Sequence, residues 1–291
     1  MPAAKRKSAA YRCVLVDTDA EGITWVTFNR PEKRNAMNPR LHAEMEQIML
    51  DLETDPRTRV IVLTGAGKAW SAGMDLKEYF RDTDADAAAQ FRSFTSNRHW
   101  AWDALTRSRK PTIAMVNGYC FGGAFIPLCA CDMVVAAEDA VFGLSEINWG
   151  IIPGGIVSKV IGDTMLFRHA LFYAMTGRTF DGRQAVAMGL ANMAVPARRL
   201  KAETLQLARE LMAKSPTVLA YTKQAVRSVR TMDIEQSYEY LFAKITALGA
   251  ADKERTRERG MTEFLDKKTF RPGLQAVARP GAARAASRRE K

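Results

Sequence analysis

Apolar and polar positions along the first two thirds of the chain predict buried strands separated by amphipathic helices. Residues 13–31 (CVLVDTDAEGITWVTFNRP) have the pattern of two strands that meet at a turn at Glu21 and Gly22. Three short, unbroken apolar segments are typical of strands buried on both faces of a sheet with parallel neighbours: VIVLTG at 60–65, TIAMVNG at 112–118 and MVVAA at 133–137. This region therefore predicts an α/β layered unit.

The first long helix is predicted by its capping residues as well as by its periodicity. Asn38 is a favourable N-cap, and Pro39 occupies the first helical position. An amphipathic helix is therefore expected within residues 38–56, with an apolar face made by Leu41, Met45, Ile48 and Leu52.

After Pro196 the pattern predicts helices and no further strand. Three helices are expected at 199–214, 217–230 and 233–249. The last of them carries an apolar stripe made by Ile234, Tyr238, Leu241, Ile245 and Leu248. Such a helical region needs a surface on which to bury its stripe.

The charge of the chain is concentrated at its two ends. The net charge is +11, but residues 1–12 contain four Lys or Arg and no acid, and residues 266–291 contain eight Lys or Arg against two acids. We interpret the basicity as a property of two disordered tails with a local attraction for phosphates. A body of nearly balanced charge makes nucleic acid an unlikely partner.

The distribution of cysteine and histidine argues against a metal site. No CxxC spacing occurs and the histidines are scattered, so zinc binding is not expected. No apolar run approaches the roughly 20 residues of a membrane span. We expect a soluble, cytoplasmic protein whose thiols are reduced. The cysteines are Cys13, Cys120, Cys129 and Cys131, and the histidines are His42, His99 and His169.

Two glycine-rich loops each follow a predicted buried strand. The first, GAGKAWSAGMD at 65–75, is not a dinucleotide fingerprint because Trp70 stands at the third glycine position, and it lacks the Gly-Lys-Ser/Thr of a phosphate loop. The second, NGYCFGGAFIPLCACD at 117–132, has Gly122 and Gly123 where a helix could begin. Each loop is either a plain tight connection or a donor of one backbone amide to a shared oxyanion.

Glu146 lies among apolar residues in the segment GLSEINWG at 143–150. A carboxylate in a water-poor pocket has a raised pKa and can act as a general acid or base. A buried ion pair or a helix cap is an equally good interpretation of the sequence alone. A serine nucleophile is less favoured, because no G-x-S-x-G segment is present and Ser145 has no histidine nearby in the sequence.

Several linked motifs resemble the crotonase superfamily, the enoyl-CoA hydratase and isomerase family. The resemblance covers about Val14 to Gly273 and rests on NRPEKRNAM, LTGAGKAWSAGMDLKEYF, PTIAMVNGYCFGGAF, ACDMVVAAEDAVFGLSEINWGIIPG and MTGRTFDGRQAVAMGL. It implies an α/β spiral of repeated ββα units over 13–198, a helical trimerisation or lid region over 199–270, and tails at 1–12 and 271–291. It also implies trimers, usually paired into hexamers.

The resemblance assigns roles to individual residues. Glu146 falls on the family's catalytic carboxylate, and the thioester oxygen would accept hydrogen bonds from the backbone N–H groups of Met74 and Gly123. No cofactor beyond the coenzyme A (CoA) of the substrate, and no metal, is implied. The residues expected to bind CoA are Lys33, Arg34, Lys68, Ala72, Asp75 and Leu76, and those expected around the acyl group are Tyr79, Gly122, Ile126, Trp149, Tyr240 and Phe242.

Three segments, AWSAGMDLKEYF, GLSEINWGI and FLDKKTFRPGLQA, resemble the branch of the family that hydrates and then cleaves hydroxycinnamoyl-CoA thioesters. Members of that branch usually carry a serine at the position of Ile126 and a tyrosine at that of Phe242, so Tyr79 is expected to hold the ring hydroxyl alone or with Tyr240 or Tyr238. Two alternatives remain open. One is an enoyl-CoA hydratase or isomerase that breaks no carbon–carbon bond, and the other is the RNA binding known in one branch of the superfamily.

Overall fold

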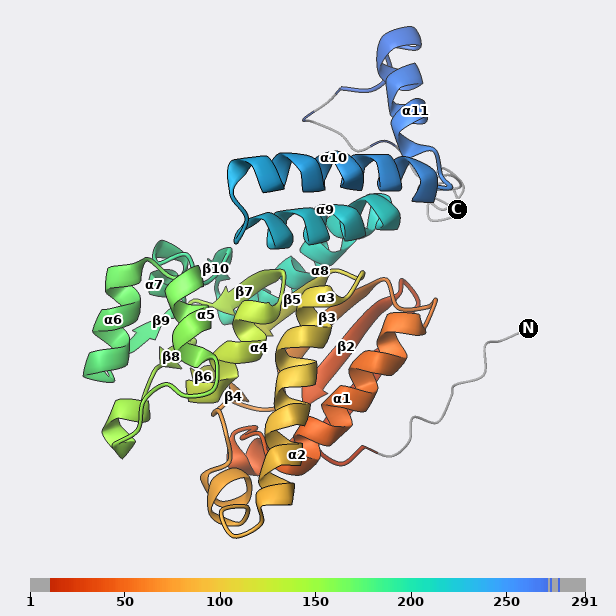
Figure 1. Ribbon diagram of the computed structural model, residues 1–291. Coiled ribbons are helices and arrows are strands. Elements are labelled where there is room, and N and C mark those ends of the chain that lie inside the picture. Colours follow the sequence, from red (N-terminus) through yellow and green to blue (C-terminus); the bar gives the residue numbers. More distant parts are fainter. Residues whose placement is uncertain (1–10, 272, 274–276, 278–291) are drawn as a thin grey trace. The chain divides into compact units, whose positions relative to one another are not determined.

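The computed structural model describes residues 11–271, 273 and 277, which form two compact units (Figure 1). The first unit contains the chain up to Arg107 together with Thr112–Leu205. The second contains Ser108–Pro111 and the chain from Gln206 onward. The tails predicted at 1–12 and 271–291 lie almost entirely outside the described residues.

A six-stranded sheet forms the centre of the first unit. Its first two strands are antiparallel and every other neighbouring pair is parallel. The strands lie in the order β1 (Val14–Thr18), β2 (Ile23–Phe28), β3 (Val60–Gly65), β5 (Thr112–Val116), β7 (Met133–Ala137) and β10 (Met193–Val195). Every residue of β3 and β5 is buried, so the unbroken apolar segments are confirmed as interior strands.

A second sheet of four short strands repeats the order of the first. Its strands lie in the order β4 (Ala69–Ser71), β6 (Tyr119–Phe121), β8 (Val141–Gly143) and β9 (Thr179–Asp181). The first three each follow a strand of the large sheet after a tight connection and are parallel to one another. The chain therefore winds as repeated ββα units, as the resemblance implied.

Helices follow the strand pairs in the first unit. Helix α1 (Pro39–Thr54) begins as predicted, because the Asn38 side chain accepts a hydrogen bond from the N–H of Leu41 at 2.9 Å. The other helices of this unit are α2 (Ala87–Arg98), α3 (Leu105–Arg107), α4 (Phe125–Ala130), α5 (Val157–Thr164), α6 (Phe167–Thr176) and α7 (Gly182–Ala187). Shorter helical turns are η1 (Pro31–Lys33), η2 (Leu76–Arg81), η3 (His99–Ala104), η4 (Gly122–Ala124), η5 (Glu146–Trp149) and η6 (Ala197–Arg199).

The second unit is helical in its described part. Helix α8 (Leu200–Met212) crosses from the first unit into the second, so the border falls a few residues after the predicted residue 198. The remaining helices are α9 (Pro216–Val229), α10 (Ile234–Ala251), α11 (Thr256–Met261) and η7 (Thr262–Asp266). The predicted stripe of α10 is not buried in the single chain, where Ile234, Tyr238 and Ile245 are exposed and Leu241 and Leu248 are half-buried.

Large aromatic side chains fix the loop that follows β3. Trp70 is fully buried in β4, its indole N–H donates to the carbonyl oxygen of Leu63, and its ring meets Phe28 edge to face at 5.4 Å. Phe28 also contacts the buried ring of Trp100 at 6.0 Å. The residue that excluded a dinucleotide fingerprint is thus the one that holds this glycine-rich loop on the sheet.

The described residues contain neither a membrane-spanning helix nor a cluster of metal ligands. None of the helices in that part of the chain is long and apolar enough to cross a membrane. Within the same residues, no group of three or more His, Cys, Asp or Glu side chains is arranged to hold a metal ion. None of the four cysteines, which all lie within the described residues, forms a disulfide.

Candidate active site

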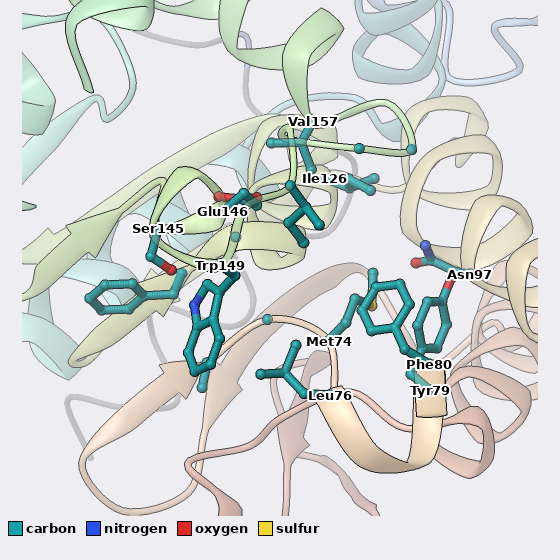
Figure 2. A pocket seen from close by; sticks show the side chains of 18 of the residues that line it. Met74, Leu76, Tyr79, Phe80, Asn97, Ile126, Ser145, Glu146, Trp149 and Val157 are labelled. Atoms are coloured by element: carbon teal, nitrogen blue, oxygen red, sulfur yellow. The ribbon is translucent and has the colours of Figure 1, made fainter. Parts of the chain in front are cut away.

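A cavity of about 770 Å³ lies within the first unit (Figure 2). Its walls come from the loop between β4 and η2, the segment from β6 to α4, the turn η5 with the loop that follows it, and helix α2. Both glycine-rich loops and Glu146, which lie far apart in the sequence, therefore meet around one space.

The loop after β4 presents the backbone N–H of Met74. A parallel bridge joins Met37 to Met74, in which Met37 donates to the carbonyl oxygen of Gly73 at 2.7 Å and Asp75 donates to that of Met37 at 2.9 Å. This bridge uses the carbonyl oxygen of Gly73 and the N–H of Asp75, so the N–H of Met74 itself faces the opposite direction. No residue in the described part of the chain accepts a hydrogen bond from it.

The loop after β6 brings Gly123 against Met74. Gly123 lies in η4, at the start of the helical segment that continues into α4, so its N–H has no partner in the preceding turn. A Cβ atom added to Gly73 would lie 3.2 Å from the nitrogen of Gly123, and one added to Gly123 would lie 2.7 Å from Cε of Met74. The two predicted donors are neighbours, and only glycine permits this approach of the two loops.

Glu146 lies directly beside these donors. It is the first residue of η5, its side chain is 9% exposed, and a Cβ atom on Gly122 would lie 3.3 Å from its Oε1. Its Oε2 is buried without a hydrogen-bond partner among the described residues, and no cation in that part of the chain pairs with it. The alternative of a buried ion pair is therefore wrong. Burial raises the pKa of Glu146.

Aromatic side chains form another wall of the cavity. Tyr79 is buried, and its ring contacts those of His42 at 5.1 Å and Phe94 at 5.3 Å. Burial raises the pKa of Tyr79 to about 12, against the opposing effect of a hydrogen bond from the Asn97 side chain. The phenol is thus neutral at physiological pH. Asn97 also lines the cavity and was missed by the sequence reasoning, because an isolated polar residue in a mixed helical sequence gives no signal.

His42 supports Tyr79 from behind without reaching the cavity. It is fully buried, and its Nδ1 accepts a hydrogen bond from the Trp100 indole at 2.9 Å. Burial lowers the pKa of His42 to about 3, so the ring is neutral.

The depressed pKa of His42 predicts a pH-dependent contribution to stability. Unfolded histidine titrates near 6.5, so the stability linked to neutral His42 is present above that pH and is lost as pH falls toward about 3. As pH falls through this range, wild type should lose this stability and His42→Gln should not. The difference between their free energies of unfolding should therefore narrow by up to about 1.4 kcal/mol per pH unit. Urea unfolding at several pH values measures it, and a constant difference would contradict the assignment.

Some of the other residues predicted to bind the substrate line the cavity, and some do not. Lys33 and Lys68 are exposed and do not line it. Asp75 does not line it either, because its carboxylate accepts hydrogen bonds from the backbone of η2 and pairs with Arg30 at 3.0 Å inside the protein. Among the residues predicted from the sequence, those that do line it, besides Met74, Gly123, Tyr79 and Glu146, are Arg34, Ala72, Leu76, Gly122, Ile126 and Trp149.

Tyr240 and Phe242 belong to the second unit. Both lie on α10, where the hydroxyl of Tyr240 donates to Oγ of Ser228 at 3.0 Å and Phe242 is exposed. Neither lines the cavity of the first unit.

Known proteins resemble this chain over most of its length. A family model described as enoyl-CoA hydratase/isomerase matches residues 18–272. A hydroxycinnamoyl-CoA hydratase-lyase of Pseudomonas fluorescens is 51% identical over 270 residues, which cover 92% of this chain and 98% of that protein.

Crystal structures of enoyl-CoA hydratases are also similar. The one from Mycobacterium smegmatis has a TM-score of 0.79 at 27% identity and covers 88% of this chain and 97% of its own. The one from Bacillus anthracis has a TM-score of 0.79 at 26% identity, with 89% and 98% covered. This chain therefore belongs to the enoyl-CoA hydratase/isomerase family.

Proposed function

We propose that the protein hydrates a hydroxycinnamoyl-CoA such as feruloyl-CoA and cleaves the product to an aromatic aldehyde and acetyl-CoA. The observation that carries the proposal is one buried carboxylate, Glu146, in one cavity with two backbone donors, Met74 and Gly123, that no acceptor among the described residues uses. The 51% identity to a hydroxycinnamoyl-CoA hydratase-lyase supports the choice of substrate and of the cleavage step.

The two backbone donors act on the thioester carbonyl. Hydrogen bonds from Met74 and Gly123 stabilise the negative charge that develops on the thioester oxygen when the acyl group becomes an enolate. The same polarisation makes the β-carbon of the unsaturated acyl group electrophilic. One preformed site therefore serves both the addition of water and the breaking of the carbon–carbon bond, because both pass through an enolate of the same thioester.

Glu146 moves the protons in both steps. In hydration its carboxylate takes a proton from water as the oxygen bonds to the β-carbon, and the resulting acid returns that proton to the α-carbon. In cleavage the carboxylate takes the proton of the β-hydroxyl, the bond between the α- and β-carbons breaks, and the aldehyde leaves. The enolate that remains receives the proton from Glu146 and becomes acetyl-CoA. No oxidation occurs, so the sequence of steps needs no redox cofactor, and in this proposal the two backbone donors, rather than a metal, polarise the thioester carbonyl.

The cavity favours a mechanism with one acid. Glu146 is the one carboxylic acid among the described residues that line it, and the apolar side chain of Ile126 lies nearby in the same wall (Figure 2). A single carboxylate with a raised pKa can alternate between base and acid near neutral pH, whereas a carboxylate of ordinary pKa would hold the proton too weakly.

Product analysis tests the proposal. With feruloyl-CoA as substrate, we expect vanillin and acetyl-CoA in equal amounts, measured by liquid chromatography after a time course. Crotonyl-CoA, which lacks the aromatic ring, serves as the comparison for hydration alone. Accumulation of a β-hydroxyacyl-CoA from feruloyl-CoA without any aldehyde would contradict the cleavage step and leave a hydratase or isomerase as the function.

We further propose that the protein self-associates into trimers or hexamers and works in the cytoplasm. The exposed apolar residues of α10 support self-association, because a soluble chain rarely leaves such a stripe in water. The lack of a disulfide among the four cysteines, all within the described residues, supports a reducing compartment.

A further inference from the structure

The cavity contains a buried polar atom that nothing in the described protein satisfies. Asn97 is 8% exposed, lines the cavity, and has no hydrogen-bond partner for Oδ1 among the described residues. Buried amide oxygens are almost always paired, and leaving one unpaired destabilises the protein. An acceptor at the wall of a cavity takes its hydrogen bond from whatever fills the cavity, which is water when the site is empty and a ligand with a suitable donor when one binds.

Tyr79 supplies the complementary group at the same place. The Asn97 side chain donates to the Tyr79 oxygen, and the Tyr79 O–H donates to no described residue. The pair therefore offers one free acceptor, Oδ1 of Asn97, and one free donor, the O–H of Tyr79. A phenolic hydroxyl both donates and accepts one hydrogen bond, so it matches this pair. An ether, a halogen or a hydrogen atom on the ring cannot donate to Oδ1.

The position of the pair agrees with the proposed chemistry. In Figure 2 the amide of Asn97 extends from α2 toward the cavity near the ring of Tyr79, while Glu146 lies on the other side with Ile126 between them. Glu146 acts at the β-carbon, and a para hydroxyl lies at the far end of the ring that the β-carbon carries. The rings of Phe80 and Phe94 line the same side of the cavity and suit an aromatic occupant.

We propose that Asn97 determines specificity for acyl groups with a ring hydroxyl, by accepting the hydrogen bond of that hydroxyl on Oδ1 while the O–H of Tyr79 donates to it. The inference rests on the proposed function for the identity of the acyl group. It explains how the ring can be held although Phe242 has no hydroxyl, since the acceptor comes from α2.

Binding of thioesters that cannot react tests the inference. We would measure dissociation constants by calorimetry for 3-(4-hydroxyphenyl)propanoyl-CoA and 3-(4-fluorophenyl)propanoyl-CoA, which are close in size but differ in the donor. Wild type is expected to bind the hydroxyl compound at least about tenfold more tightly, because the fluoro compound leaves Oδ1 unpaired. In Asn97→Leu the preference should shrink to about threefold or less, since Oδ1 is gone and only Tyr79 can still bond to the ring hydroxyl.

Ser93→Ala is the matched control. Ser93 lies one turn earlier on α2, is equally buried and does not line the cavity, so this variant should keep the wild-type ratio of affinities. A wild-type ratio near one, or an unchanged ratio in folded Asn97→Leu, would overturn the inference.

A third ligand keeps the inference testable if Asn97→Leu does not fold. The 4-methoxy analogue can accept from Tyr79 but cannot donate to Asn97, so wild type should bind it about tenfold more weakly than the hydroxyl compound, and equal binding would refute the role of Asn97. Because none of these saturated thioesters can be hydrated or cleaved, the affinities do not depend on turnover. A failure of the proposed activity is therefore visible separately, in the products formed from feruloyl-CoA.

Discussion

Glu146→Gln is expected to lower the turnover of feruloyl-CoA by roughly 10²-fold or more while the protein remains folded and binds CoA thioesters. Glutamine has nearly the shape of glutamate, so the cavity and the donors at Met74 and Gly123 persist. It cannot take a proton from water or from the β-hydroxyl, so both steps lose their base. Steady-state kinetics measures both effects when hydration and aldehyde release are followed separately, so that the loss in the rate of each step is obtained.

The control for this variant is Glu138→Gln. Glu138 pairs with Arg183 near the surface and does not line the cavity, so its loss should leave turnover unchanged. Full activity of Glu146→Gln would refute the assignment of the base. Loss of the folded state would instead indicate that the carboxyl group is structural.

The pH dependence of wild type and of Glu146→Gln gives a second test of the role of Glu146. Because burial raises the pKa of Glu146, wild-type kcat/KM should fall as pH decreases through a value above the ordinary range of glutamate. The raised pKa also means that the neutral acid is favoured in the folded protein. The associated stability is present below the unfolded pKa and is lost as pH rises through the folded pKa. Glu146→Gln lacks this titration, so its stability relative to wild type should increase as pH rises.

The parts of the site that the sequence made predictable have strict chemical requirements. Gly122 adopts a φ of +53° beside Glu146, and Gly123 admits the Met74 side chain, so substitution at either position would disturb the loop. A glutamate among apolar residues is equally conspicuous, because a charged group is rarely placed there without use. These features make the two loops and the carboxylate recognisable in the amino-acid sequence.

Other features depend on tertiary contacts that a local pattern does not encode. Strands β4, β6, β8 and β9 have three residues each, too few for an alternating pattern to be recognised. The periodicity of α10 identified its apolar face but could not say whether the single chain covers it. Asn97 becomes noticeable only when its unpaired oxygen is seen at the cavity wall.

Asp75 was predicted to contact CoA, but the structure gives its side chain a different role. Its position beside Met74 made it a plausible contact for CoA, but its side chain turns away from the cavity into a buried cluster. Burial alone would raise the pKa of Asp75, yet hydrogen bonds from the backbone N–H of Glu78 and from the Arg30 guanidinium outweigh it and lower the pKa. The carboxylate is therefore charged and committed to holding the loop that carries Met74.

Arg30→Met is expected to destabilise the protein by about 3–5 kcal/mol, because it would leave Asp75 charged and unpaired in the interior. Arg30 is 8% exposed and donates to Asp75 at 3.0 Å, to Glu78 at 2.6 Å and to the carbonyl oxygen of Ala36. It thus ties the segment before α1, which carries Met37, to the start of η2, which directly follows Met74 in the chain. Turnover should fall as well, since the Met74 N–H would no longer be held in place. Urea unfolding measures the first effect and feruloyl-CoA kinetics the second.

A matching change in an exposed ion pair shows whether burial is the cause of the lost stability in Arg30→Met. Lys159 and Asp163 lie four residues apart on α5 and are both solvent-exposed, so Lys159→Met should change the free energy of unfolding by no more than about 0.5 kcal/mol. Combining Arg30→Met with Asp75→Asn should recover part of the lost stability, because the second change removes the charge that the first left unpaired. A loss in Arg30→Met no greater than that of Lys159→Met would mean that water reaches Asp75. The position of Met74 would then have to be maintained by its bridge to Met37 alone.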